Sequence, residues 1–169
     1  MTEILDIPSP FMDKRAVSLP ALCAMIGTPW VWQMSGLDGA DCFGRLRAAY
    51  KTVGVEIPDI TGDYSLTASA PQLHRAQMTS RLISRELPGW TQIKSPVFGA
   101  MIVVRLGGHP VHVGFYIDGP DGGILHACED MGRTLIEPLT RYHGEGFSKI
   151  HGYYLPSHAL ADSDIINEA

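Results

Sequence analysis

The chain has 169 residues and a formal net charge of −5, and hydrophobic residues make up 45% of it. This length and composition predict one globular domain over residues 1–169 and argue against an intrinsically disordered chain. The acidic balance also argues against a nucleic-acid or anionic-membrane binder, which would need clustered lysine and arginine.

The cysteines and the N-terminus bear on the compartment. Cys23, Cys42 and Cys128 are too few, and odd in number, for a disulfide framework, which suits a reducing compartment. The stretch from Met1 to Asp6 has no basic region followed by an apolar core, and no apolar run is long enough to span a membrane. We expect a chain made in the cytoplasm without a signal peptide and not inserted into a membrane.

The first part of the chain predicts an arm followed by a short helix. Residues 1–17 carry two prolines and mixed charges, which is typical of an arm with at most one short strand. Residues 19–26 predict an apolar helix capped by Ser18, with Cys23 in the core.

Two longer helices follow. From Cys42 onward, apolar or small residues recur at helical spacing until Gly54, which predicts a helix with Cys42 on its buried face. Asp41 is placed to cap this helix. A further helix is expected after Ser69, which would cap it, and should end before Pro88.

Beyond Trp90 the pattern changes to short apolar or alternating runs separated by glycine-rich turns, which predict successive hairpins. Residues 157–169 are polar and are expected to fray. The fold class is therefore α+β, with N-terminal helices packed on a central antiparallel sheet of about five or six strands. The expected strands lie within residues 97–106, 111–117, 123–126, 134–139 and 150–155.

Cys42, His112 and His126 form the candidate catalytic set. A thiol at a helix N-terminus favours the thiolate, which is the nucleophilic form. In the run 111–117, His112 shares a face with Gly114, where the missing side chain leaves room for the Cys42 helix. The next hairpin brings His126 back toward His112. A thiol, a histidine and a second polar group that holds the histidine suit covalent catalysis.

Other interpretations of the same residues remain open. Cys42 fits an inert core thiol, and His126 fits an ordinary polar residue at a strand end. His109, His112, His126 and Cys128 are residue types that bind zinc, but their spacing does not match a standard zinc finger. We therefore predict no metal and no cofactor.

Four motifs carry a family resemblance: Gly27-Thr28-Pro29-Trp30, Gly39-Ala40-Asp41-Cys42-Phe43-Gly44, His112-Val113-Gly114-Phe115-Tyr116-Ile117 and Ile124-Leu125-His126-Ala127. Their order and spacing over about residues 20–155 resemble the NlpC family of papain-like cysteine peptidases, which cut peptidoglycan stem peptides. Phe43 and the stretches 45–58 and 150–155 look more like the phage-tail branch of that family.

The resemblance implies a role for each site residue. Cys42 would be the nucleophile, with its backbone N–H in the oxyanion hole, and His112 would be the general base and acid. His126 would orient the ring of His112. Trp30 stands where many members have a tyrosine near the oxyanion hole, so Trp30 and Asp41 would border the substrate groove. We expect the Cys42 sulfur within hydrogen-bond reach of one His112 ring nitrogen and His126 roughly 3 Å from the other.

The function implied by the resemblance is a cysteine endopeptidase that hydrolyses amide bonds of peptidoglycan through an acyl-enzyme. It would act at the cell wall, delivered by a phage or prophage tail, with tail proteins as partners. Two alternatives stay open. The chain could be a non-catalytic or latent assembly protein of the tail tip, or it could be a papain-like amidase or acyltransferase that uses the same acyl-enzyme.

Overall fold

The computed structural model describes residues 4–120, 122–143 and 148–162. The chain begins with helices and continues into a sheet, as the sequence predicts. The elements in chain order are η1 Met12–Lys14, α1 Arg15–Ala24, α2 Cys42–Thr52, η2 Thr61–Asp63, α3 Gln72–Glu86, η3 Leu87–Gly89, β1 Trp90–Ile93, β2 Met101–Leu106, β3 His109–Ile117, β4 Gly123–Cys128, β5 Arg133–Pro138, η4 Leu139–Tyr142, β6 Ser148–Pro156 and α4 Ser157–Ala161.

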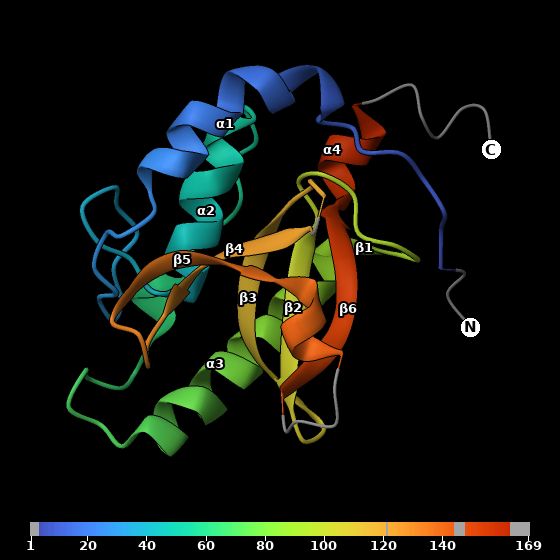
Figure 1. Ribbon diagram of the computed structural model, residues 1–169. Helices are drawn as coiled ribbons and strands as arrows, with labels where there is room; N and C mark the ends of the chain where they lie inside the picture. Colours follow the sequence, from blue (N-terminus) through green and yellow to red (C-terminus); the bar gives the residue numbers. More distant parts are fainter. Residues whose placement is uncertain (1–3, 121, 144–147, 163–169) are drawn as a thin grey trace.

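The described strands form one antiparallel sheet in the order β1-β6-β2-β3-β4-β5 (Figure 1). This confirms the α+β class and the predicted central sheet. Five of the strands overlap the predicted runs, and β1 is the addition. The consecutive strands β2 to β5 lie side by side, so His112 on β3 and His126 on β4 occupy neighbouring strands.

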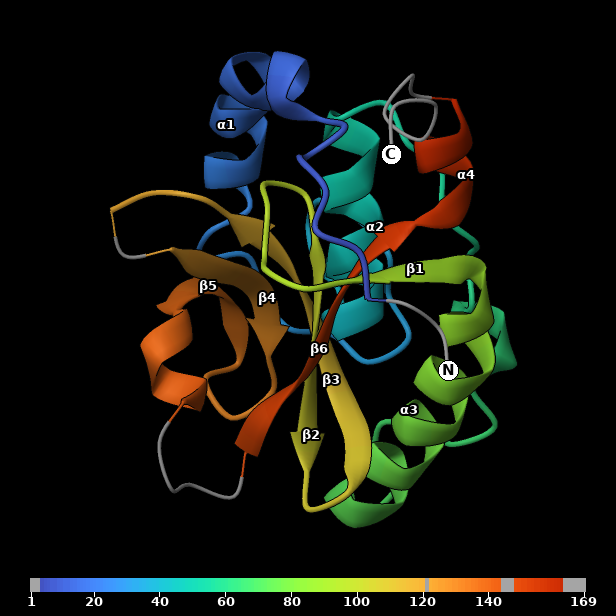
Figure 2. The same ribbon diagram turned by 90° about the vertical axis from the view of Figure 1, so that its right-hand side faces the viewer.

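Helices α2 and α3 both pack on β3, and α2 also packs on β4 (Figure 2). Tyr50 is fully buried on α2, and its hydroxyl donates to the Gly99 carbonyl at 2.6 Å. Its ring packs against Phe115 and Trp90, at 5.2 and 5.5 Å between centroids. These contacts fix α2 on the sheet and therefore fix the position of its first residue, Cys42.

The first helix differs from the prediction. It begins at Arg15 rather than near Leu19, so Ser18 lies inside it and donates to the Thr52 carbonyl at 2.8 Å instead of capping. The earlier start places Ser18 and Leu22 on the buried face and leaves Cys23 exposed. The prediction that Cys23 belongs to the core is therefore wrong.

Two other predicted boundaries also shift. Pro71 occupies the N-cap position of α3 without a side-chain cap, and Ser69 instead pairs with the Thr67 hydroxyl at 2.9 Å. In the predicted frayed tail, Ser157–Ala161 form helix α4, whereas residues 163–169 lie outside the described part of the chain. Across the residues that the structure describes, no helix combines the length and the apolar character needed to cross a bilayer.

The N-terminal arm runs along the sheet edge and into the core. Leu5 forms an isolated parallel bridge with Ile93 of β1. Ser9 is buried and donates to the Phe98 carbonyl at 2.5 Å. The Phe11 ring is only 4% exposed, packs against Tyr50 and occupies the space that a side chain at Gly99 would need. The described arm is therefore anchored to the fold.

Candidate active site

Hydrogen bonds to the Asp41 side chain hold the loop before α2 against the first turn of the helix. The Asp41 carboxylate accepts the Gly44 N–H at 2.8 Å and the Gln33 N–H at 3.1 Å, which confirms Asp41 as the helix cap. A side chain at Gly44 would collide with the Met34 carbonyl, so the close approach of this loop requires a glycine there. Cys42 is consequently held as the first residue of α2, and it is 8% exposed.

The Cys42 thiol is neutral in this environment. Burial, followed by the negative charge of Asp41, raises the pKa of Cys42 to about 12, although the backbone N–H of Val113 favours the thiolate. The expectation of a partly ionised thiol is therefore not met, because desolvation outweighs the helix N-terminus. Among the hydrogen bonds of the described residues, none joins the thiol to His112, so the sulfur–nitrogen distance expected from the sequence stays a prediction.

Gly114 brings the two histidines together, though not in the way the sequence suggested. The three atoms nearest to a side chain placed at Gly114 all belong to β4, in Ile124, Leu125 and His126. The glycine thus lets β4 lie close against the face of β3 that carries His112. The result is a hydrogen bond of 2.8 Å between His112 Nε2 and His126 Nδ1, with the rings edge to face. This distance agrees with the value of roughly 3 Å expected for the pair.

A carboxylate that the sequence analysis missed stands behind His126. In the β4–β5 register, Ile124 faces Glu137 and His126 faces Leu135, so His126 and Glu137 are diagonal neighbours on one face. His126 Nε2 lies 3.1 Å from Glu137 Oε2. The available signal was a single acidic residue in the predicted strand 134–139, one hairpin away from His126.

Glu137 is itself held by two residues of η4. The Tyr142 hydroxyl donates to Glu137 Oε2 at 2.7 Å, and Arg141 forms an ion pair with Oε1. Glu137 is 6% exposed, whereas the Arg141 side chain is 63% exposed. A continuous set of polar contacts therefore runs from His112 through His126 and Glu137 to the protein surface.

Both histidine rings are neutral near pH 7. Burial, followed by the proximity of His126, lowers the pKa of His112 to about 3. Burial, followed by the charge of Arg141, lowers the pKa of His126 to about 4. A neutral imidazole has one nitrogen that carries hydrogen and one that carries a lone pair, so it can accept a proton from a thiol.

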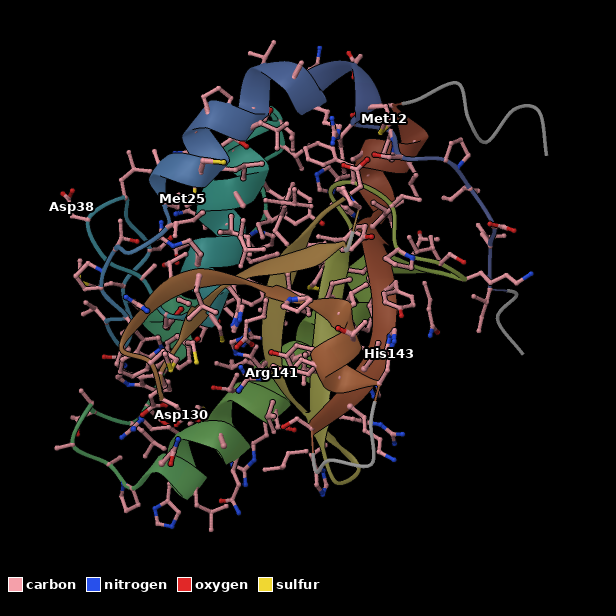
Figure 3. All side chains as sticks on the ribbon, viewed as in Figure 1. Met12, Met25, Asp38, Asp130, Arg141 and His143 are labelled. Atoms are coloured by element: carbon pink, nitrogen blue, oxygen red, sulfur yellow. The ribbon has the colours of Figure 1, made fainter. Side chains whose placement is uncertain are left out.

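Cys42, His112 and His126 line one cleft of about 630 Å³. Trp30 also borders it, together with residues from the start of α3 and from the β4–β5 turn. Figure 3 shows Asp130 beside the first turn of α3, and Arg141 farther along the same side of the molecule. None of residues 4–17, the described part of the arm, lines the cleft, so this part of the arm does not fill it.

Cys42, His112 and His126 all lie within a segment that matches a known protein family. A family model described as the NlpC/P60 family matches residues 27–154 of the sequence. The chain belongs to the NlpC/P60 family. The comparison with curated proteins gives no significant match.

Solved structures of NlpC/P60 proteins share this fold. A lipoprotein-like member from Staphylococcus aureus is 16% identical over 92% of this chain, with a TM-score of 0.56. A Bacillus cereus member is 21% identical over 89%, with a TM-score of 0.55. An NlpC protein from Trichomonas vaginalis is 17% identical over 83%, with a TM-score of 0.52. The matches cover 43%, 41% and 45% of those chains, so this chain spans less than half of their length.

Another residue that the sequence analysis missed in this NlpC/P60 domain is Tyr64, which lies in the segment between α2 and α3 and reaches Asp41, the neighbour of Cys42. Its side chain hydrogen-bonds with the Asp41 carboxylate and is 8% exposed. Burial is the largest cause that raises the pKa of Tyr64; at the high pH where Cys42 also ionises, the charges of Cys42 and Asp41 raise it further, so Tyr64 stays neutral near pH 7. The ring packs on Trp32, 4.6 Å between centroids. No local sequence pattern marks Tyr64.

Two tryptophans and an arginine form one wall of the cleft. The Arg75 guanidinium lies 6.0 and 5.7 Å from the rings of Trp30 and Trp32 and forms an ion pair with Glu129. The Trp32 indole N–H donates to the Leu66 carbonyl at 2.9 Å, so Trp32 is a packing residue. Trp30 is the tryptophan that contributes a partly exposed ring to the wall.

The residues considered for zinc do not gather around one point. The ring nitrogens of His112 and His126 face each other and Glu137, while His109 is exposed at the start of β3. Over the part of the chain that the structure describes, no three side chains of His, Cys, Asp or Glu are arranged to hold a metal ion.

Proposed function

We propose that the chain is a cysteine endopeptidase that hydrolyses amide bonds in peptidoglycan stem peptides, with Cys42 as nucleophile and His112 as base. The observation that carries this proposal is the placement of the Cys42 thiol, at the start of α2, in one cleft with the hydrogen-bonded pair of His112 and His126. NlpC/P60 proteins are generally cell-wall hydrolases, which supports peptidoglycan as the substrate class.

The reaction starts from a neutral pair. As the Cys42 sulfur attacks the carbonyl carbon, its proton moves to His112, and a new S–C bond forms while the carbonyl π electrons move to oxygen. The backbone N–H of Cys42 is one of the helix-start donors and can stabilise that oxygen. His112 then protonates the leaving amine as the C–N bond breaks. Water, deprotonated by His112, hydrolyses the thioester and frees Cys42.

Association with a phage tail is the finer part of the proposal. Its support is the likeness of Phe43 and of the segments 45–58 and 150–155 to the phage-tail branch of the family. Such a chain would be carried to the cell wall by the particle, with tail proteins as partners.

The proposal is tested by incubating the protein with purified peptidoglycan and identifying the soluble products by mass spectrometry. Wild-type protein should release peptide fragments with a new amine and a new carboxylate. Cys42→Ala should release none, and His112→Gln should lower the rate strongly. Intact stem peptides after prolonged incubation of folded wild-type protein would contradict the peptidase proposal and favour a latent or assembly role.

A further inference from the structure

Among the hydrogen bonds of the described residues, none joins Glu137 to Cys42 or His112, yet Glu137 determines which ring nitrogen of each histidine carries the hydrogen. Glu137 Oε2 accepts from Tyr142 at 2.7 Å, and Oε1 accepts from Arg141. The Glu137 carboxylate accepts from both of these donors and has no hydrogen of its own to donate, so it can only accept a hydrogen bond from His126. The Nε2 of His126, 3.1 Å away, must therefore carry the ring hydrogen.

The tautomer of His126 in turn determines the tautomer of His112. Since neutral His126 carries its hydrogen on Nε2, its Nδ1 has a lone pair. The contact of 2.8 Å between His126 Nδ1 and His112 Nε2 needs one hydrogen, and this hydrogen can only come from His112. Neutral His112 then has its lone pair on Nδ1, the ring nitrogen that His126 does not engage, and His112 lines the same cleft as Cys42.

We infer that Glu137 is a positioning residue that sets the tautomers of both histidines, so that His112 presents an unprotonated Nδ1 to the Cys42 thiol. This inference rests on the proposed function for its catalytic consequence but not for its structural content. When the thiol proton arrives on Nδ1, the resulting imidazolium charge is stabilised through His126 by the buried carboxylate.

Glu137→Gln gives the sharpest test because the two side chains have nearly the same shape. Arg141 can only donate at the Oε1 position, whereas the Tyr142 hydroxyl at Oε2 can turn and accept, so the amide oxygen should stay at Oε1 and the NH₂ should take the Oε2 position. An amide N–H facing His126 Nε2 requires a lone pair on that nitrogen. The hydrogen of His126 then moves to Nδ1, and the hydrogen of His112 moves to its own Nδ1.

The direct readout is the ¹⁵N NMR spectrum of histidine-labelled protein at pH 7, in which nitrogens with hydrogen and nitrogens with a lone pair resonate in separate regions. Single His→Gln variants assign the two rings. Wild-type protein should show hydrogen on Nε2 of both His112 and His126, and Glu137→Gln should show it on both Nδ1 atoms. A wild-type His112 with hydrogen on Nδ1, or tautomers that do not change in Glu137→Gln, would overturn the inference.

The second readout is cleavage of peptidoglycan. Glu137→Gln should lower the rate by roughly 100-fold or more, since a wrong histidine tautomer costs on the order of 10⁴-fold in the Ser-His-Asp triad of serine proteases. Glu137→Ala should be less harmful than Glu137→Gln, because water in the vacated space can accept from His126. A merely structural role for Glu137 would give the opposite order. Glu56→Gln, at an exposed position outside the cleft, is the matched control and should change neither readout.

The two proposals fail separately. Correct tautomers in a wild-type protein that does not cleave peptidoglycan would contradict the proposed function and leave the role of Glu137 in place. Cleavage by wild-type protein together with an equally active Glu137→Gln variant would contradict the role of Glu137 and leave the proposed function in place.

Discussion

Asp41, the residue before Cys42, has two effects on the site: it holds Cys42 in place and it disfavours ionisation of the Cys42 thiol. The Asp41 carboxylate holds the loop and the helix start together through the N–H groups of Gly44 and Gln33. Its negative charge is also one cause of the raised pKa of the Cys42 thiol. The residue that positions the nucleophile therefore also keeps it protonated until a base takes the proton.

The pH dependence of alkylation tests this state of Cys42. The rate with iodoacetamide should keep rising through pH 8, since the pKa of Cys42 is raised to about 12 and only the thiolate reacts. Asp41→Asn should shift the profile to lower pH, because it removes a negative charge next to the thiol. Peptide mass spectrometry measures the rate, with the exposed Cys23 as internal reference. A rate plateau between about pH 5 and pH 8 would instead reveal a preformed thiolate–imidazolium pair.

At the scale of elements, the site depends on how closely β3 and β4 approach each other. Gly114 on β3 leaves the space that Ile124 and His126 of β4 occupy. Ile124 is fully buried, so it has little freedom to move aside. The hydrogen bond between the two histidines is therefore a consequence of strand packing.

Gly114→Ala should disturb this packing. The added methyl group should destabilise the protein by about 1–3 kcal/mol, as overpacking in a core does, and should weaken the contact between His112 and His126. Urea unfolding measures the first effect, and histidine ¹⁵N NMR measures the second. Gly108→Ala in the β2–β3 turn is the matched control, because a methyl group there meets no other atom within 4 Å. Equal stability of the two variants would contradict the close-approach argument.

The sequence predicts those parts of the site that local patterns encode. Cys42 could be placed at a helix start from the spacing of apolar residues, and His112 and His126 could be placed on adjacent strands from alternation and turns. Glu137 and Tyr64 could not be assigned, because each reaches the site through a register or a loop path that only tertiary packing fixes. The exposure of Cys23 could not be predicted from its apolar neighbours, because the helix begins at Arg15, before the apolar run, and buries Ser18 and Leu22 instead.

For the whole molecule, the buried ionisable groups near the cleft determine how stability depends on pH. His112 and His126 have lowered pKa values of about 3 and 4, so the unfolded chain takes up protons before the folded chain as pH falls below about 6.5. Burial, as the dominant effect, raises the pKa of Asp41 to about 6 and acts in the opposite sense between about pH 6 and pH 4. The two histidines outnumber this single carboxyl, so these three groups together favour the unfolded state as pH falls.

Thermal unfolding between pH 7 and pH 4 checks this balance. The melting temperature should fall with pH in wild-type protein. The fall should be shallower in His112→Ala, which removes a group whose pKa is lowered by folding. It should be steeper in Asp41→Asn, which removes a group whose pKa is raised by folding. An unchanged slope in His112→Ala would show that His112 does not resist protonation in the folded state.

The arm contributes to stability at a site separate from the cleft. Phe11→Ala should destabilise the protein by roughly 3–5 kcal/mol, since the ring is buried against Tyr50 and over Gly99. The alkylation profile of Cys42 should stay the same, because no described arm residue lines the cleft. Chemical denaturation measures the loss, and Met12→Ala, at an exposed neighbour, should change stability by less than about 0.5 kcal/mol. A changed Cys42 profile would indicate that the arm also controls access.

The exposed position of Arg141 has an evolutionary consequence. Its guanidinium reaches Glu137 from the surface, with 63% of the side chain in solvent, while Glu137 and His126 behind it are buried. Exchanging a surface residue usually leaves a fold nearly undisturbed, whereas exchanging a buried, hydrogen-bonded polar residue does not. Sequence drift at position 141 can thus adjust the charge felt by the histidines while the core stays constant. Substitutions of Arg141 during evolution can therefore change the electrostatic environment of His126 and Glu137 while the buried residues stay the same.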